Sequence, residues 1–460
     1  MIKNDLTDTI AAISTPVGEG GIGIVRISGK CALKIAEEIF VSPSNAKPAT
    51  FKTYTTHYGR IVKGLSVIDE VILTVMLSPR SYTKEDIIEI NCHGGIIALR
   101  DVLSLVLEKG ARIAEPGEFT KRAFLNGRID LTQAEAVLDI IRAKTDAALK
   151  VSLEQLKGTL SVSINKYRDS LLMILAQVEA NIDFPEEEIS KLEMQAILNK
   201  IKELDVAIKE MINNSKLARV LREGIRVVIC GKPNVGKSSL LNALLKEERS
   251  IVTSIAGTTR DSIEEIIEIK GIPLRIVDTA GILRARDLVE KKAVLRSKQQ
   301  IVAADLVIVI FDGSKMLSKE DMQLVGKLKG KTCLAIINKM DLKQKIQRKK
   351  LLSIFKDVID ISAKKSKNID LLEKAIADLV YGGFILNPES VMVSNLRHIK
   401  VLQKVEKVIA DLLKSLDNKL SLEYIAQDIK EALGLLDEML GKEFSGDLLD
   451  KIFSEFCIGK

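Results

Sequence analysis

The feature that most constrains this 460-residue chain is a glycine-rich octet between an apolar run and a helical run. Residues 231–238 (GKPNVGKS) match the pattern G-x-x-x-x-G-K-[ST], follow the apolar run 225–230 and open a helical run at 239. Backbone N–H groups of such a loop approach nucleotide phosphates at a helix N-terminus. Lys237 is placed to reach the β- and γ-phosphates, and the Ser238 hydroxyl to ligate magnesium. The octet predicts a nucleoside triphosphate site.

Three further motifs follow, each after a predicted strand. Residues 278–281 (DTAG) place Asp278 to hold magnesium through water and the N–H of Gly281 at the γ-phosphate. Residues 338–341 (NKMD) place the Asp341 carboxylate to accept hydrogen bonds from guanine N1–H and the 2-amino group, which adenine does not offer. Residues 362–364 (SAK) resemble the loop that contacts guanine O6. The ordered set resembles the Ras-like superfamily and predicts a GTPase.

The predicted GTP-binding residues come from these loops and from the segment after the phosphate loop. They are Asn234, Val235, Gly236, Lys237, Ser238, Ser239, Thr253, Ser254, Ile255, Ala256, Gly257, Thr258, Thr259, Asp278, Thr279, Ala280, Gly281, Asn338, Lys339, Met340, Asp341, Ser362, Ala363 and Lys364.

Catalysis needs a device other than the glutamine of Ras-type enzymes, because Ile282 follows Gly281. Asn234 offers a neutral oxygen within the phosphate loop, and residues 253–258 can add carbonyl oxygens. A monovalent cation held there, beside the β- and γ-phosphates, would stabilise the developing negative charge.

The rest of the chain alternates between α/β and helical patterns. Residues 1–123 mix short strands with turns, 131–182 predict one or two long helices that end before Pro185, and a helical stretch follows to about residue 221. Strand-like runs at 225–230, 266–269, 274–277, 306–311, 334–337 and 358–361 predict a mostly parallel, doubly wound sheet. After Pro388 the chain reads as helix again. The fold class is therefore multidomain α/β, with an α/β unit inserted between two helical segments that we expect to pack into one bundle.

Composition excludes several classes of protein. Five dispersed cysteines in no C-x-x-C pair favour reduced thiols in a cytoplasmic setting over a disulfide framework. No apolar run approaches the length of a membrane span, so no membrane is expected. Aromatic residues make up 4% of the chain, which disfavours a base-stacking platform, and a net charge of +7 does not by itself establish nucleic-acid binding.

Motifs at both ends of the chain narrow the resemblance. Residues 255–261 (IAGTTRD), 15–23 (TPVGEGGIG), 115–124 (EPGEFTKRAF) and 456–460 (FCIGK), with the loops above, resemble the MnmE (TrmE) family over essentially the whole chain. These are tRNA uridine 5-carboxymethylaminomethyl modification GTPases, within the TrmE-Era-EngA-YihA-septin-like class.

The resemblance implies four segments. Residues 1–123 would bind tetrahydrofolate and form a homodimer, 124–222 and 383–460 would build the helical domain, and 223–382 would be the Ras-like GTPase domain. It implies a potassium-dependent cytoplasmic GTPase that acts with the FAD-containing partner MnmG (GidA) as a heterotetramer. A 5-formyl or 5,10-methylene tetrahydrofolate would supply the one-carbon unit for an aminomethyl or carboxymethylaminomethyl group on carbon 5 of the tRNA wobble uridine. GTP hydrolysis would drive a conformational change of the GTPase domain.

Site residues carried over by resemblance belong to three groups. The folate contacts would be Arg26, Glu89, Arg128 and Lys460. The potassium ligands would be Asn234, Thr253, Ile255 and Thr258, and the magnesium ligands Ser238 and Thr259. Glu290, which in an isolated sequence is typical of a solvated helix position, would orient the attacking water, and Cys457 would lie near the folate with a possible role in catalysis.

Other interpretations stay open at this point. A ribosome-assembly GTPase explains the GTPase motifs but gives the two ends of the chain no task. A folate enzyme carrying a GTPase switch, or a pure signalling switch, are further alternatives. Cys457 does not fit a prenylation signal, because Gly459 and Lys460 end the chain. The pair Cys92–His93 is expected to be structural, since neighbours in a strand point to opposite faces.

Overall fold

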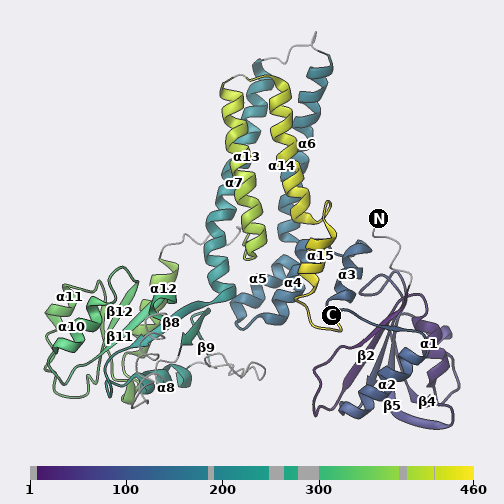
Figure 1. Cartoon of the computed structure of the whole chain (residues 1–460), viewed down its shortest axis with the longest axis horizontal. Helices are drawn as coiled ribbons and strands as arrows, with labels where there is room; N and C mark the ends of the chain where they lie inside the picture. The colour runs from purple at the N-terminus through teal and green to yellow at the C-terminus, as the bar shows by residue number, and fades with distance from the viewer. Residues whose placement is uncertain (1–7, 185–190, 248–263, 278–299, 383–390, 419) are drawn as a thin grey trace. The chain divides into compact units, whose positions relative to one another are not determined.

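The computed structural model describes residues 8–184, 191–247, 264–277, 300–382, 391–418 and 420–460 (Figure 1). The chain divides into two compact units. Unit 1 comprises residues 1–138, 155–188 and 420–460, and unit 2 comprises 139–154 and 189–419. Each unit contains one β-sheet. The domain boundaries given above from the sequence stay a prediction.

Unit 1 contains a seven-stranded sheet in the order β3-β4-β5-β6-β2-β1-β7, antiparallel except where β1 meets β7. The strands are β1 (Ile10–Ile13), β2 (Gly23–Ser28), β3 (Phe40–Val41), β4 (Thr55–Lys63), β5 (Ser66–Met76), β6 (Ile87–Cys92) and β7 (Arg112–Ile113).

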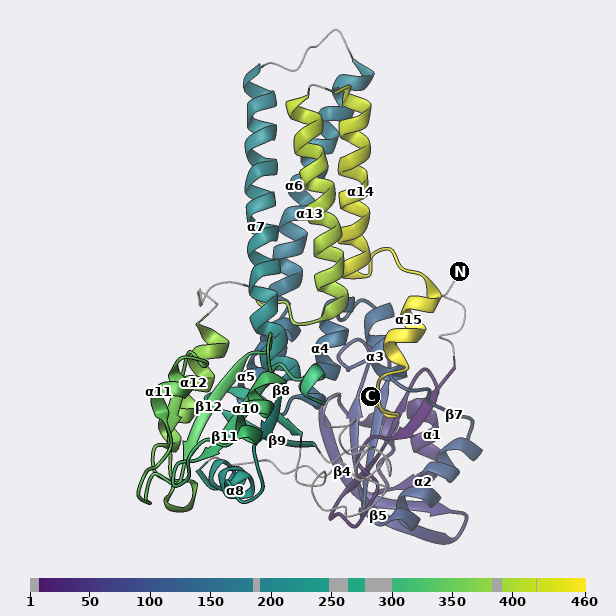
Figure 2. The ribbon, with the colours of Figure 1, turned by 60° about the vertical axis from the view of Figure 1, so that its left-hand side comes forward.

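Helices cover one face of this sheet. Helices α1 (Ala32–Ile39) and α2 (Ile96–Glu108) bury alternate strand residues such as Val25, Leu73 and Ile90 (Figure 2). The period of two that places these side chains on one face leaves residues such as Arg26 and Glu89 on the other. The predicted α/β region is confirmed. A short 3₁₀ helix, η1 (Pro48–Thr50), packs beside α1.

Unit 2 contains a six-stranded sheet in the order β13-β12-β11-β8-β10-β9. All neighbouring strands are parallel except β9 and β10. The strands are β8 (Ile225–Cys230), β9 (Glu264–Ile269), β10 (Ile272–Val277), β11 (Leu306–Asp312), β12 (Cys333–Asn338) and β13 (Val358–Asp360).

Both faces of the six-stranded sheet are buried around its central strands, which explains why β8, β11 and β12 are nearly continuous apolar runs. Helices α8 (Lys237–Glu247) and α12 (Ile369–Tyr381) pack on the face that includes Ile229 and Ile308. The other face packs against α10 (Lys319–Gly326) and α11 (Arg348–Leu352). A 3₁₀ helix, η3 (Ala363–Lys365), follows β13. The predicted doubly wound sheet is confirmed.

Helices from before and after the six-stranded sheet pack in pairs. Within unit 1, α6 (Thr159–Asp183) packs along α14 (Leu422–Leu440), and within unit 2, α7 (Lys191–Glu223) packs along α13 (Leu396–Asp417), as Figures 1 and 2 both show. The remaining helices are α3 (Glu118–Leu125), α4 (Leu131–Arg142), α5 (Asp146–Leu156) and α15 (Gly446–Phe453). No helix in the described ranges is long and apolar enough to cross a membrane.

The expectation of one or two helices over 131–182 is wrong, because three helices fill this stretch. The first break precedes α5, where the Thr145 hydroxyl accepts a hydrogen bond from the N–H of Ala148 at 3.1 Å. The second break is at Gly158, whose φ of +90° starts a new helix. A Cβ at Gly158 would lie 3.2 Å from the Gln133 side chain, so the turn also packs tightly.

A fully buried arginine links three segments of unit 1. The Arg122 guanidinium is 0% exposed and donates to Asp8 at 2.6 Å, Glu118 at 2.9 Å and Glu85 at 3.2 Å. Arg112 adds a second pair to Glu118 at 2.7 Å. Burial alone would raise the pKa of Glu118, but hydrogen bonds from the two arginines and from the N–H of Glu115 outweigh it and lower that pKa below its ordinary value. The Glu118 carboxylate therefore remains charged in the folded state near neutral pH.

Replacing this arginine should destabilise unit 1 strongly. Arg122→Met leaves Glu85 without the arginine it pairs with, and leaves Asp8 and Glu118 paired with Arg112 alone. It should lower the free energy of unfolding by about 3 kcal/mol near neutral pH. Lowered pKa values of Asp8 and Glu118 mean that their contribution is complete above their ordinary values of 3.8 and 4.5 and is lost as the pH falls through the lowered values. The deficit should therefore shrink below about pH 4. Urea unfolding across this pH range measures both effects.

Arg100→Met is the matched control, because Arg100 pairs with Asp101 on the surface. It should cost only about 0–1 kcal/mol. An Arg122→Met deficit no larger than that of the control, or one unchanged in acid, would contradict a charge network that holds unit 1 together.

Candidate functional site

The predicted nucleotide loops meet at one edge of the six-stranded sheet. Strands β8, β11, β12 and β13 run parallel, so their carboxyl ends lie along the same edge. The phosphate loop follows β8, residues 338–341 follow β12, and Ser362 follows β13. This is the edge where open α/β sheets bind their ligands.

The phosphate loop is shaped by glycine and by its own lysine. Gly236 has a φ of +103°, and a Cβ there would lie 2.2 Å from the Asn338 amide nitrogen, so no other residue fits. The Lys237 ammonium donates to the carbonyl oxygens of Gly231 at 2.9 Å and Lys232 at 2.8 Å. Burial lowers the pKa of Lys237. The Lys237 ammonium is thus fixed by the two residues that directly follow β8.

The Asn338 side chain connects the phosphate loop with the loop at residues 362–364. Its amide nitrogen donates to the carbonyl oxygen of Val235 at 2.8 Å, and its amide oxygen accepts from the N–H of Ala363 at 3.0 Å. Both hydrogen bonds are buried. One side chain therefore fixes the spacing between three of the loops predicted from the sequence.

The other two side chains of the 338–341 motif are also fixed. The Lys339 ammonium donates to the carbonyl oxygen of Asn234 at 2.8 Å and to the Asp312 carboxylate at 2.6 Å. The Asp341 carboxylate accepts a hydrogen bond from the Ser362 hydroxyl at 2.7 Å, which lowers the pKa of Asp341. Asp341 is therefore a charged acceptor at the loop predicted to recognise guanine. Asp312 carries no motif of its own, so its role could not be predicted from the sequence.

Several predicted residues lie outside the described residues. They belong to the segment after the phosphate loop, to the 278–281 motif, and to the predicted catalytic acid. These residues are Thr253, Ser254, Ile255, Ala256, Gly257, Thr258, Thr259, Asp278, Thr279, Ala280, Gly281 and Glu290. The structure therefore brings together the phosphate loop and the two guanine loops, and the predicted roles of the other residues stay predictions. Within the described ranges, no group of three or more His, Cys, Asp or Glu side chains forms a metal site.

A second cluster forms where the end of the chain meets the seven-stranded sheet of unit 1. The Arg26 guanidinium donates to Glu89 at 2.7 Å and to the carbonyl oxygen of Gly459 at 3.1 Å. The carbonyl oxygen of Lys460 accepts from the N–H of Phe119 at 3.2 Å. Gly459 has a φ of +92°, and a Cβ there would lie 2.4 Å from the carbonyl oxygen of Ile13. Three of the four predicted folate contacts are thus held around one tail.

Aromatic rings line the same cluster. Arg26 lies over the Phe119 ring at 5.6 Å, and Arg128 lies over the Tyr82 ring at 4.7 Å. The Tyr82 hydroxyl is within 2.9 Å of the Thr120 hydroxyl. Burial raises the pKa of Tyr82, while the hydrogen bond with Thr120 and the charges of Arg128 and Arg26 act in the opposite direction. Tyr82 was missed, because nothing in its local sequence distinguishes it.

The cysteines differ in their surroundings. Cys457 is exposed next to this cluster, and its carbonyl oxygen accepts from the N–H of Gly117 at 3.4 Å. Burial raises the pKa of Cys92 to about 12, so this thiol stays protonated. Its neighbour His93 bonds instead to Asp69 at 2.6 Å. The two residues point apart, as expected of a structural pair.

Fold and loops together define a phosphate-loop GTPase of the Ras-like class, joined to an antiparallel sheet domain and long helices. The model described as "MnmE helical domain" matches residues 131–457, and that of "GTP-binding protein TrmE N-terminus" matches residues 9–128. The chain belongs to the MnmE family of tRNA modification GTPases.

Individual relatives match over nearly their full length. The protein named "tRNA modification GTPase MnmE" from Clostridioides difficile (strain 630) is 50% identical over 457 residues, covering 99% of this chain and all of the relative. The protein of the same name from Bacillus subtilis (strain 168) is 46% identical over 458 residues, covering 98% of this chain and all of the relative. A solved structure of Era, with MgGDPNP and part of 16S ribosomal RNA, is 30% identical with a TM-score of 0.28, covering 40% of this chain and 66% of that one.

Removing the Asn338 bridge should weaken nucleotide binding. Asn338→Ala leaves the carbonyl oxygen of Val235 and the N–H of Ala363 buried without partners, at about 1–3 kcal/mol each. We expect the Kd for GTP to rise by about 10-fold or more, since about 1.4 kcal/mol corresponds to a factor of ten. Titration with a fluorescent GTP analogue measures this. Asn418→Ala, at the exposed end of α13, should bind like the wild type; an unchanged Kd for Asn338→Ala would refute the bridging role.

Proposed function

We propose that this chain is a potassium-dependent GTPase that modifies the tRNA wobble uridine together with the FAD-containing partner MnmG, in a heterotetramer. It would use a tetrahydrofolate one-carbon unit to install an aminomethyl or carboxymethylaminomethyl group at carbon 5. GTP hydrolysis, with magnesium bound through Ser238 and Thr259, would drive a conformational change of the GTPase domain in the cytoplasm. Relatives named tRNA modification GTPases, matching over 98–99% of this chain, support the tRNA role.

One observation carries the GTPase part of the proposal. The Asn338 amide holds the phosphate loop and residues 362–364 together, and the charged Asp341 of the same motif is fixed by the Ser362 hydroxyl. A carboxylate accepts two hydrogen bonds, which suits the N1–H and 2-amino donors of guanine. Adenine has no N–H donor at these two positions, so we infer a preference for GTP over ATP.

Potassium would supply a positive charge beside the β- and γ-phosphates. Asn234 is the described member of the predicted ligand set, and its backbone adopts a φ of +63°. The backbone carbonyl oxygen of Asn234 accepts a hydrogen bond from Lys339, whereas the Asn234 side chain is exposed. That amide oxygen suits an oxygen-preferring cation. Thr253, Ile255 and Thr258 would complete the set, and Glu290 would orient the attacking water.

The cluster around the C-terminal tail fits a folate. Arg26 and Glu89 are 17% and 18% exposed and place a cation beside an anion. The cation suits the carboxylates of a folate, and the anion suits its ring N–H donors. The Phe119 and Tyr82 rings offer flat apolar surface for a pterin. Arg26, Glu89, Arg128 and Lys460 would hold the folate, which supplies a one-carbon unit when bound. Cys457 would act beside it.

The same sheet face supports a homodimer through residues 1–123. Strand pairing places Tyr58 opposite Ile72 on the face that carries Arg26 and Glu89. Tyr58 is 55% exposed and Ile72 is 47% exposed, whereas the opposite face lies beneath α1 and α2. Exposed aromatic and aliphatic side chains on a sheet are typical of an interface. A second copy of the chain would cover them.

Loss of the protein should change tRNA nucleosides. Cells lacking the chain should lose the modified wobble uridine, as measured by nucleoside mass spectrometry of total tRNA. The wild-type chain and the control Lys329→Ala, an exposed lysine in the loop after α10, should restore it. Lys237→Ala, which lacks the phosphate-binding charge, should not. An unchanged nucleoside profile in the deletion strain would reject the proposed function and favour a ribosome-assembly GTPase.

Hydrolysis should depend on the monovalent cation. At equal ionic strength, GTP turnover in potassium should exceed turnover in sodium by about 10-fold or more, because a charge fixed at the transferring phosphoryl group stabilises the transition state. Asn234→Ala should abolish most of this difference. The exposed Asn418→Ala serves as the matched control. Equal rates in the two salts would remove potassium from the proposal.

A further inference from the structure

The loop and helix after the guanine-recognition motif carry an unusual charge. Residues 342–350 include five basic residues and no acidic one. Arg348 is paired, because its guanidinium bonds to Asp360 at 3.1 Å. Lys343, Lys345 and Lys349 are exposed and carry no ion pair in the part of the chain that the structure describes. This stretch therefore presents concentrated positive charge to solvent.

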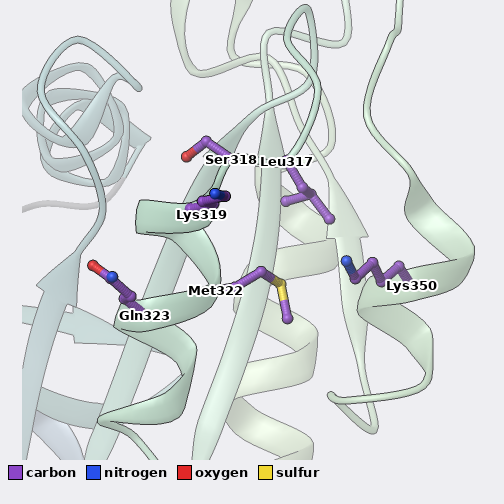
Figure 3. Close-up of a pocket in the computed structure, with 6 residues that line it drawn as sticks. All are labelled: Leu317, Ser318, Lys319, Met322, Gln323 and Lys350. Atoms are coloured by element: carbon purple, nitrogen blue, oxygen red, sulfur yellow. The ribbon is translucent and has the colours of Figure 1, made fainter.

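A pocket of about 460 Å³ lies next to this stretch, and lysines from both α10 and α11 line it. Lys350 reaches from α11 toward Leu317 and Met322, and Lys319 lies at the start of α10 (Figure 3). The loop 343–347 is fixed alongside, since the N–H of Lys345 donates to the carbonyl oxygen of Gly313 at 2.8 Å. We name the resulting surface the α10–α11 lysine cluster, which consists of Lys319, Lys343, Lys345, Lys349 and Lys350.

Two acidic side chains next to the cluster share one lysine outside it. Glu320 and Asp321 in the first turn of α10 pair with Lys232 at 3.5 Å and 3.0 Å. Lys232 also donates to the Ser318 hydroxyl, so it is anchored at this helix end. Lys232 therefore offsets part of the charge of these two acids, and the five lysines of the cluster outnumber them. Its positive potential is available to an anionic partner.

We propose that the α10–α11 lysine cluster binds the phosphate backbone of tRNA, an inference that rests on the proposed function. Lysines unpaired with acids are the side chains that release counterions from a nucleic-acid backbone. They carry no base information and act by positioning the RNA. Protein interfaces are depleted of lysine, so an RNA fits this surface better than a protein does. The GTPase domain thereby holds the tRNA whose wobble base is modified elsewhere.

The test compares two full-length variants that lose the same charge. The first is K343Q/K345Q/K349Q/K350Q. The control is K30Q/K34Q/K47Q/K52Q, four exposed lysines of unit 1 that carry no ion pair among the described residues. Unmodified tRNA transcript is the probe, and fluorescence anisotropy gives its Kd at several salt concentrations. GTP hydrolysis without RNA checks that each variant is folded.

The cluster variant should bind tRNA about 10-fold or more weakly at physiological salt. Its log–log salt slope should fall by about 3–4, because four phosphate contacts are lost at about 0.9 each. The control should stay within about 2-fold of the wild type. Equal weakening of both variants, unchanged binding by the cluster variant, or no tRNA binding by the wild type would overturn the inference. Loss of MnmG binding with tRNA affinity intact would assign the surface to a protein partner. The nucleoside profile of the deletion strain decides the proposed function independently.

Discussion

The nucleotide half of the molecule depends on one buried amide. Parallel strands bring the loops after β8, β12 and β13 to a common edge, but a common edge does not set their spacing. The Asn338 side chain does, because its donor and its acceptor each satisfy a backbone group on a different loop. Gly236 makes this contact possible by leaving no Cβ in the way. Phosphate recognition and base recognition therefore share one fixed frame, in which Lys339 and Asp341 are held by partners of their own.

The cluster around Arg26 and Glu89 in unit 1 is held in a different way, through the residues at the end of the chain. Gly459 passes so near Ile13 that any side chain would collide, and Arg26 captures its carbonyl oxygen. Behind this contact, Arg122 fixes the segments around residues 8, 85 and 118 through buried charge. A buried ion network of this kind contributes little net stability but penalises any other arrangement of those segments. The position of the tail is thus specified by the Arg26 hydrogen bond, by Gly459 and by the apolar packing of Phe456.

Much of this architecture could be predicted from the sequence, and the omissions have physical causes. The strands of the six-stranded sheet were located because both of its faces are buried, so the strands are apolar runs bounded by glycine and polar loops. The helix break before α5 was missed because a threonine cap competes with a helical pattern that continues through it. Tyr82, Asp312 and Arg122 were missed because their roles come from partners in other segments. The motifs identified loops that contact a ligand, whereas the residues that position those loops carry no local pattern.

Helix α10 connects the phosphate loop with the α10–α11 lysine cluster. Lys232 belongs to the phosphate loop, and its ammonium group is bound to Ser318 and Asp321 at the first turn of α10. Lys319 lies between those two residues and belongs to the cluster. A shift of the phosphate loop would therefore change the contacts that Lys232 makes with the first turn of α10, which also carries Lys319 of the proposed RNA contact. Contact alone does not make two sites interdependent, since a ligand shifts an equilibrium only by its difference in affinity for two states. Coupling between GTP and RNA at this helix requires that RNA bind one nucleotide state better, and by linkage GTP would then bind the RNA complex better by the same factor.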